Sequence, residues 1–233
     1  VLVINAQQCK TILFDSGLAD DLRPGTAIMV SATMAADDIK EIAAQLETRK
    51  LKVLDAPVSG GAAKANVGEM TVMAAGSDGT FEHLAPVLDA VADKVYRVGT
   101  EIGMGAMVKI IHQLLAGVHI AVGAEAMAMA AKAGISLDVM YEVVTNAAGN
   151  SWMFENRMKH VVDGDYSPKS MVDIFVKDMG LVTDTAQSLK FPLYLGSTAY
   201  QMFTAASNSG HGQEDDSAVI KIFKGIDLPV KGT

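Results

Sequence analysis

The stretch LKVLDAPVSGG (residues 51–61) decides the organisation of this chain. An apolar run ends at Asp55 and is followed by Pro57, a lone Ser59 and the adjacent glycines Gly60 and Gly61. A turn usually needs only one glycine. A glycine pair beside a hydroxyl, directly after a buried strand, therefore indicates backbone held open for a ligand.

Strands and helices alternate on both sides of this stretch, which predicts a doubly wound, Rossmann-type sheet. The first six residues, VLVINA, read as a continuous apolar strand of the kind found in parallel sheets. Further strands are expected in residues 23–33, 51–61, 69–76 and 93–99, with helices in residues 17–22, 36–50 and 81–92.

The pattern changes after Gly99. Residues 103–133 predict one long apolar helix, and the remaining residues carry helical periodicity without a convincing strand. Those helical segments are residues 136–148, 170–189, 192–209 and 215–226. We therefore expect a partial NAD-binding Rossmann-like domain in residues 1–100 and an all-helical substrate and oligomerisation domain in residues 101–233, joined by the long helix.

Composition limits the partners. The net charge of -8 argues against nucleic acid. The single Cys9, placed near a strand end, fits a reducing compartment and has little support as a nucleophile. The apolar run 110–124 is too short and too polar to span a bilayer. We expect a cytoplasmic protein that binds neither membrane nor nucleic acid.

The chain opens inside a strand, so we expect it to be the downstream part of a longer protein. Upstream residues would then hold the glycine-rich first turn of the cofactor domain. The glycines Gly103 and Gly105 do not replace that turn, because Val108 stands where a third glycine would be needed. They are expected to serve the inter-domain turn and close helix packing.

Lys109 lies early in the long apolar helix, where a lysine is costly unless it reaches solvent or does chemistry. His112 and Gln113 follow three and four residues later, on the same helix face, and Gly105 is expected to clear space beside the lysine. Burial lowers the pKa of a lysine, which suits proton exchange with a hydroxyl. The alternative is a surface lysine in a polar stripe. No residues at metal-ligand spacing support a metal site.

Three other residues can be explained by structure without a functional role. Lys177 and Asp178 stand in the middle of a predicted helix, where such a pair is usually a solvated face. Trp152, the single tryptophan, is expected in the core or at a domain interface.

Taken in order, the DAPVSGG segment, Gly105-xxx-Lys109 and Lys177-Asp178 resemble the β-hydroxyacid dehydrogenase family across essentially the whole chain. The resemblance implies that Ser59, Gly60 and Gly61 bind a substrate carboxylate and that Lys109 is the catalytic acid/base. It also implies a cofactor-side role for Thr33, with Ala32 in place of the family's serine. Lys177 would close over the cofactor, supported by Asp178.

The chain departs from the family at His112 and Gln113, where the family usually carries asparagines. Gln113 keeps an amide, and His112 adds a group for a further substrate hydroxyl. The resemblance therefore implies oxidation of a small hydroxy sugar acid, expected to be L-threonate, with 3-hydroxyisobutyrate or tartronate semialdehyde as the alternative substrates. The non-enzymatic alternative is an inactive assembly module, which would not need Lys109.

The expected cofactor is NAD. NADP stays open, because the residue that selects between them would lie upstream of residue 1. We also expect a homo-oligomer, dimer or tetramer, because the long helix is apolar around most of its circumference.

Overall fold

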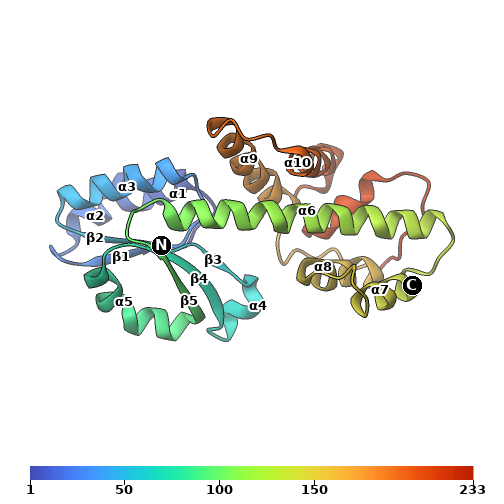
Figure 1. The fold of residues 1–233 in the computed structure, drawn as a ribbon, viewed down its shortest axis with the longest axis horizontal. Coiled ribbons are helices and arrows are strands. Elements are labelled where there is room, and N and C mark those ends of the chain that lie inside the picture. Colours follow the sequence, from blue (N-terminus) through green and yellow to red (C-terminus); the bar gives the residue numbers. More distant parts are fainter. Residues whose placement is uncertain (233) are drawn as a thin grey trace. The chain divides into compact units, whose positions relative to one another are not determined.

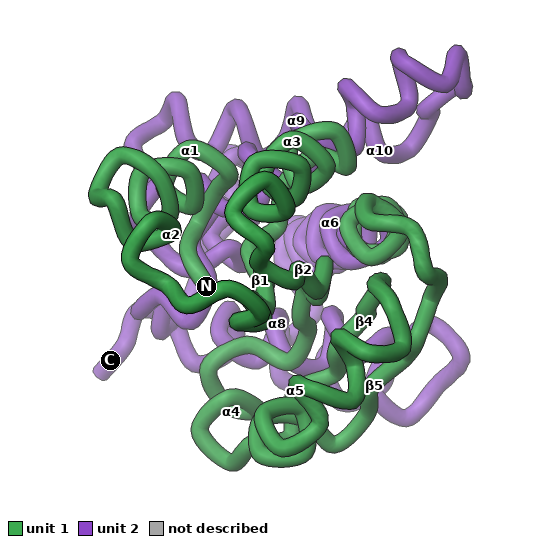
Figure 2. Tube along the Cα trace, turned by 90° about the vertical axis from the view of Figure 1, so that its left-hand side faces the viewer, with its two compact units in different colours: residues 1–112 green, residues 113–233 purple. Residues whose placement is uncertain are grey.

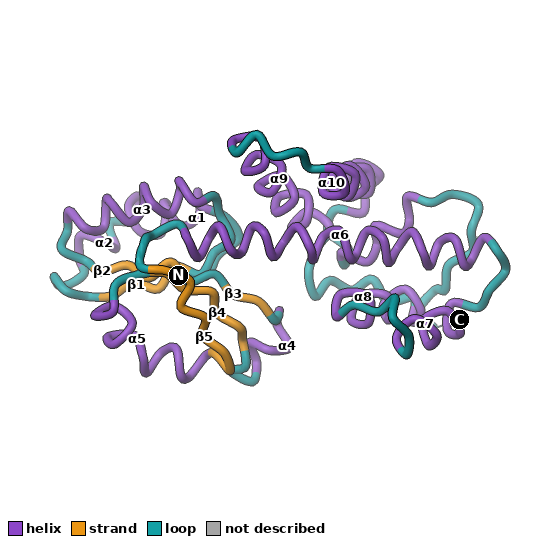
Figure 3. Tube along the Cα trace, viewed as in Figure 1, coloured by secondary structure: helices purple, strands orange, loops and turns teal. Residues whose placement is uncertain are grey.

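A computed structural model describes residues 1–232, which divide into two compact units. Unit 1 is residues 1–112 and unit 2 is residues 113–233 (Figure 2). Unit 1 contains a mixed sheet with helices, and unit 2 is helical (Figure 3). The fold class expected from the sequence is confirmed.

The sheet of unit 1 has five strands. They are β1 (Ala27–Val30), β2 (Lys52–Asp55), β3 (Val58–Ser59), β4 (Met70–Ala75) and β5 (Ala92–Gly99). The order is β1-β2-β4-β3, and β5 also pairs with β4. The pairs β1–β2 and β4–β5 are parallel.

Strand β4 runs antiparallel to β2 and β3, a departure from the all-parallel arrangement of a doubly wound sheet. The connection explains the direction. Residues 60–69 join β3 to β4, and a parallel crossover needs a dozen or more residues. The break between β2 and β3 falls at Ala56 and Pro57, where the carbonyl of Pro57 still accepts from Met73 N at 3.0 Å.

The expectation of a strand in VLVINA is wrong. Val1 does lie beside β1, donating its N to Met29 O at 2.5 Å and accepting from Ser31 N at 2.8 Å. The chain then turns into a helix at Asn5, whose side chain accepts from Gln8 N and caps α1 (Ala6–Lys10). Cys9 consequently lies fully buried in α1 rather than near a strand end.

Helices cover both faces of this sheet (Figure 1). On one side lie α1, α2 (Leu18–Asp21) and α3 (Ala36–Thr48). Helix α3 buries four residues, as its apolar spacing predicts: Ile39, Ile42, Ala43 and Leu46. On the other side α5 (Asp78–Val91) buries Phe81, Leu84 and Leu88 against Leu54 and Val72. A short π-helix (Thr11–Asp15) and α4 (Gly61–Asn66) complete the unit.

The long helix α6 (Met104–Lys132) begins in unit 1 and continues into unit 2. By length and composition it could cross a membrane, but half of its most apolar window is buried in the protein. The core helix of a soluble protein has the same properties, because buried helices and membrane-spanning helices are both apolar around most of their circumference.

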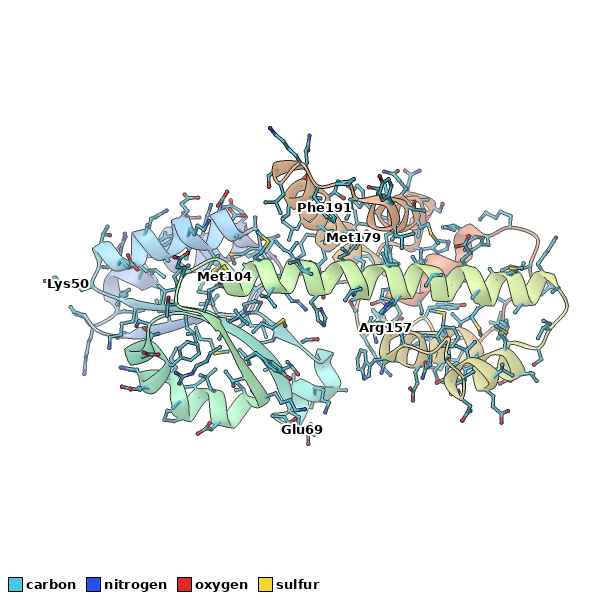
Figure 4. All side chains as sticks on the ribbon, in the orientation of Figure 1. Lys50, Glu69, Met104, Arg157, Met179 and Phe191 are labelled. Carbon is cyan, nitrogen blue, oxygen red and sulfur yellow. The ribbon has the colours of Figure 1, made fainter. Side chains whose placement is uncertain are left out.

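Unit 2 adds α7 (Leu137–Thr145), α8 (Trp152–Asp163), α9 (Val172–Ser188) and α10 (Tyr194–Ala206), then a π-helix (Ser207–His211) and a 3₁₀ helix (Asp216–Ile222). The sequence did not predict α8, because charged residues interrupt its apolar spacing. Met179 of α9 packs on Gly117 of α6, where a Cβ would collide with its sulfur (Figure 4). Arg157 of α8 forms a buried ion pair with Asp216 at 2.7 Å.

Candidate functional site

The loop after β3 has a backbone that favours glycine. Gly60 has a φ of +128° and Gly61 a φ of +62°, in the region that side chains disfavour. A Cβ at Gly60 would also lie 2.6 Å from Cβ of Lys64. The turn therefore favours glycine at both positions, and no atom lies within 4 Å of where a Cβ of Gly61 would be.

Ser59 and His112 come together in unit 1. The hydroxyl Oγ of Ser59 lies 3.3 Å from Nε2 of His112, although 53 residues separate them. Lys109, one turn before His112, is only 6% exposed, so the surface-lysine alternative is wrong. A hydroxyl, an imidazole and a buried amine thus belong to two neighbouring elements of one unit.

Asp55 is a buried residue that the sequence reasoning missed. It ends β2, is 2% exposed, and its Oδ2 accepts from Gly103 N at 2.9 Å and from Ala106 N at 3.1 Å. Burial raises the pKa of this carboxyl, while the backbone hydrogen bonds act in the opposite direction. An acidic residue at the end of a buried strand was the signal available in the sequence.

Gly105 lies where α6 packs against the sheet. A Cβ there would lie 2.6 Å from Asp55 O and 2.7 Å from Met73 O. The glycine therefore lets the first turn of α6 approach the ends of β2 and β4. Gly103, with a φ of +101°, forms the turn that leads into this helix. Both observations fit the expected role in close helix packing.

In unit 2, Asp178 is linked to Gln113 by a hydrogen bond and to Lys177 by an ion pair. Gln113 Nε2 donates to Asp178 Oδ2 at 2.5 Å, and Lys177 Nζ lies 2.7 Å from Asp178 Oδ1. Gln113 is 7% and Asp178 3% exposed, so Asp178 does not lie on a solvated face. The amide of Gln113, expected to meet substrate, is engaged by Asp178.

A cavity of about 540 Å³ lies in unit 2 beside α7 and α8. Its lining includes Trp152, which is 57% exposed, so of its two expected places, the core and a domain interface, the core is wrong. None of the predicted site residues lines this cavity. Within residues 1–232, no group of three or more His, Cys, Asp or Glu side chains could hold a metal ion.

Comparison with known proteins identifies the family. Residues 1–99 match the NAD binding domain of 6-phosphogluconate dehydrogenase, and residues 103–223 match the family described as NAD-binding of NADP-dependent 3-hydroxyisobutyrate dehydrogenase. The L-threonate dehydrogenase of Haemophilus influenzae is 70% identical over 233 residues, which are 100% of this chain and 77% of the relative. The chain belongs to the β-hydroxyacid dehydrogenase family.

Other members of the β-hydroxyacid dehydrogenase family are equally similar. The L-threonate dehydrogenase of Escherichia coli K12 is 71% identical over 98% of this chain and 76% of its own length. A crystal structure described as 3-hydroxyisobutyrate dehydrogenase from Salmonella typhimurium is 68% identical, with a TM-score of 0.93 over 95% of this chain and 78% of that one. The two names differ in substrate at nearly equal identity.

Membership of the β-hydroxyacid dehydrogenase family makes this chain an NAD-linked dehydrogenase. Unit 1 fits a dinucleotide where β1 and β2 end together, with Val30 paired to Asp55, because dinucleotides bind at the carboxyl ends of parallel strands. Thr33 follows β1 at this edge and is half-buried. In unit 2, the ammonium group of Lys177 is paired with the carboxylate of Asp178.

Proposed function

We propose that this dehydrogenase oxidises L-threonate to its 2-oxo acid with NAD as the cofactor. The observation that carries the proposal is the 70% identity with the Haemophilus influenzae L-threonate dehydrogenase along the entire chain. The proximity of Ser59 and His112 supports it, because a polyhydroxylated acid offers both a carboxylate and additional hydroxyls to bind.

The proposed substrate site uses residues of the β3 loop and α6. Ser59, with the backbone N–H groups of Gly60 and Gly61, holds the carboxylate without a charged side chain. His112 donates to or accepts from a substrate hydroxyl beside Ser59, from which it is already at hydrogen-bond distance. Gln113 is proposed to act from the same helix, fixed by its hydrogen bond to Asp178.

Lys109 is the proposed catalytic acid/base. It is 6% exposed and lies one turn before His112, and it is proposed to accept the proton from the C2 hydroxyl. Bound NAD supplies the acceptor for the hydride from C2. Thr33, Lys177 and Asp178 are proposed to hold the cofactor, with the carboxylate of Asp178 orienting the ammonium group of Lys177.

A panel of hydroxy acids tests the proposal. The formation of NADH from NAD is followed by absorbance with the purified full-length enzyme and L-threonate, 3-hydroxyisobutyrate or L-serine. For tartronate semialdehyde, the consumption of NADH is followed instead. We expect the highest kcat/KM with L-threonate and NAD. Preference for 3-hydroxyisobutyrate, the substrate in the name of the Salmonella relative, would replace the proposed substrate. Absence of turnover with the whole panel would favour the inactive assembly module.

We further propose a cytoplasmic homo-oligomer that assembles through residues 101–233, separate from the cofactor domain in residues 1–100. Leu115, Val122 and Met129 expose an apolar face of α6 and are 53–75% exposed. Large apolar residues around the α9–α10 turn are also exposed: Leu189, Phe191, Tyr194 and Leu195. Light scattering at micromolar concentration tests this, and a monomer would contradict it.

A further inference from the structure

The first turn of α6 lacks a cap of its own. Gly103 precedes the helix and has no side chain, and its φ of +101° favours glycine there. The N–H groups at the start of a helix need partners from elsewhere. Here the partner is Asp55, whose Oδ2 accepts from Gly103 N and Ala106 N.

The carboxylate of Asp55 has few other roles in the fold. It is 2% exposed, and the hydrogen-bond donors described for it are backbone N–H groups of residues 103 and 106. Burial of an unpaired carboxylate is costly unless hydrogen bonds compensate for lost water. The two backbone donors of α6 provide this compensation, so the strand end and the helix start stabilise each other.

This contact joins the two segments that carry the proposed site. Asp55 lies four residues before Ser59, and Ala106 lies three residues before Lys109. Gly105 brings the same helical turn against the carbonyls of Asp55 and Met73. The hydrogen bond between Ser59 and His112 is a second junction one turn later. The turn that contains Lys109 is therefore flanked by a contact with the end of β2 and by a contact with Ser59.

We propose that Asp55 is a positioning residue for the dehydrogenase reaction, because its carboxylate anchors the first turn of α6 and so sets the place of Lys109 relative to Ser59. The inference rests on the proposed role of Lys109. Misplacement of a catalytic group by about 1 Å can cost about 10²-fold in rate. A mere stabilising role would leave the folded enzyme's kcat unchanged.

Three variants distinguish an effect on the position of Lys109 from an effect of the Asp55 charge and from a loss of protein stability. Asp55→Ala removes the acceptor, whereas Asp55→Asn keeps an oxygen for the two donors and removes the charge. Leu54→Ala is the matched control, because Leu54 is equally buried in β2 but packs with Phe81, Leu84 and Leu88 on the α5 side. Melting temperature, kcat, and KM for hydroxy acid and for NAD are measured for each.

We expect Asp55→Ala to lower kcat by about 10² with little change in KM for NAD, and Asp55→Asn to recover kcat to within about tenfold of wild type. Leu54→Ala should lower the melting temperature at least as much while kcat changes less than about twofold. A folded Asp55→Ala enzyme with wild-type kcat overturns the proposal, as does an equal loss of kcat in Leu54→Ala.

If Asp55→Ala does not fold, Asp55→Glu carries the test. This variant keeps the carboxylate but places its oxygens one methylene further from the backbone. The kcat of the folded enzyme should therefore fall, and a wild-type kcat would overturn the proposal.

A measurement that does not depend on catalysis tests the positioning role of Asp55 independently of the proposed substrate. The side-chain signals of isotope-labelled lysines are titrated by NMR, and the Lys109 signal is assigned by its loss in Lys109→Arg. We expect its titration midpoint to move in Asp55→Ala and to stay in Asp55→Asn. Equal movement in both variants would indicate a charge effect and overturn positioning. Wild-type inactivity toward every hydroxy acid would contradict only the proposed function.

Discussion

Ser59 Oγ and His112 Nε2 lie 3.3 Å apart, which joins the glycine loop after β3 to the helix that carries Lys109. The contact gives His112 a fixed partner, so the imidazole is held beside the proposed carboxylate site. A histidine at this place can distinguish substrates by their hydroxyl groups, because neutral imidazole offers one donor and one acceptor.

Lys109→Ala should lower kcat by about 10²–10⁴, since it removes the proposed acid/base. The fold should persist, because alanine is favourable in helices. Steady-state kinetics and circular dichroism measure the two effects. Lys52→Ala, at an exposed position of β2, is the control and should retain wild-type kcat. A Lys109→Ala enzyme within tenfold of wild type would mean that another group moves the proton.

Ser59→Ala should raise KM for the hydroxy acid by about tenfold, which corresponds to about 1.4 kcal/mol of ground-state binding. Its kcat should fall less, because the proposed contact of the hydroxyl is with the carboxylate and not with the reacting carbon. Ser197→Ala, on the exposed face of α10, should change neither constant. An unchanged KM with a collapsed kcat would instead put Ser59 at the reacting centre.

His112→Asn restores the residue type usual for the family and should reduce the preference for L-threonate over 3-hydroxyisobutyrate. We expect the ratio of the two kcat/KM values to fall by about tenfold, the scale of one lost hydrogen bond. Competition assays with both substrates measure this ratio directly. His119→Asn, seven residues along α6, is the control. Equal loss for both substrates would show that His112 supports the site without selecting between them.

Asp216 makes stability depend on pH. Burial raises the pKa of Asp216 to about 7, although Arg157 lowers it. The folded protein therefore holds a proton between about pH 4 and 7 that the unfolded chain has released. This stabilisation is complete below about pH 4 and is lost as the pH rises through 7, by up to roughly 4 kcal/mol.

Urea unfolding at a series of pH values tests this linkage. The free energy of unfolding of wild type should fall across the window from pH 4 to 7, relative to Asp216→Asn, which has no carboxyl to titrate. Asp163→Asn, in a half-exposed ion pair with Lys159, should keep the wild-type slope. Parallel curves for wild type and Asp216→Asn would exclude Asp216 as the source.

Local pattern was sufficient for most elements of this fold. The apolar spacing of α3 named its four buried residues, and the continuous apolar character of residues 103–133 predicted α6 almost to its ends. Such patterns report which side of an element is buried, because burial of that side stabilises the element. They fail where charges interrupt the spacing, as in α8, or where an apolar run turns into a capped helix, as at Asn5.

Motif order in the sequence was sufficient to identify Lys109, Ser59 and the Lys177–Asp178 pair as candidates, and to predict the family that the comparisons confirmed. Only the tertiary structure showed which groups meet. Ser59 contacts His112 across 53 residues, Gln113 contacts Asp178 across 65, and Asp55 accepts from Gly103 N, just before α6, across 48. A side-chain pattern specifies burial along one element, whereas the hydrogen-bond partner of a buried group depends on which other element packs against it.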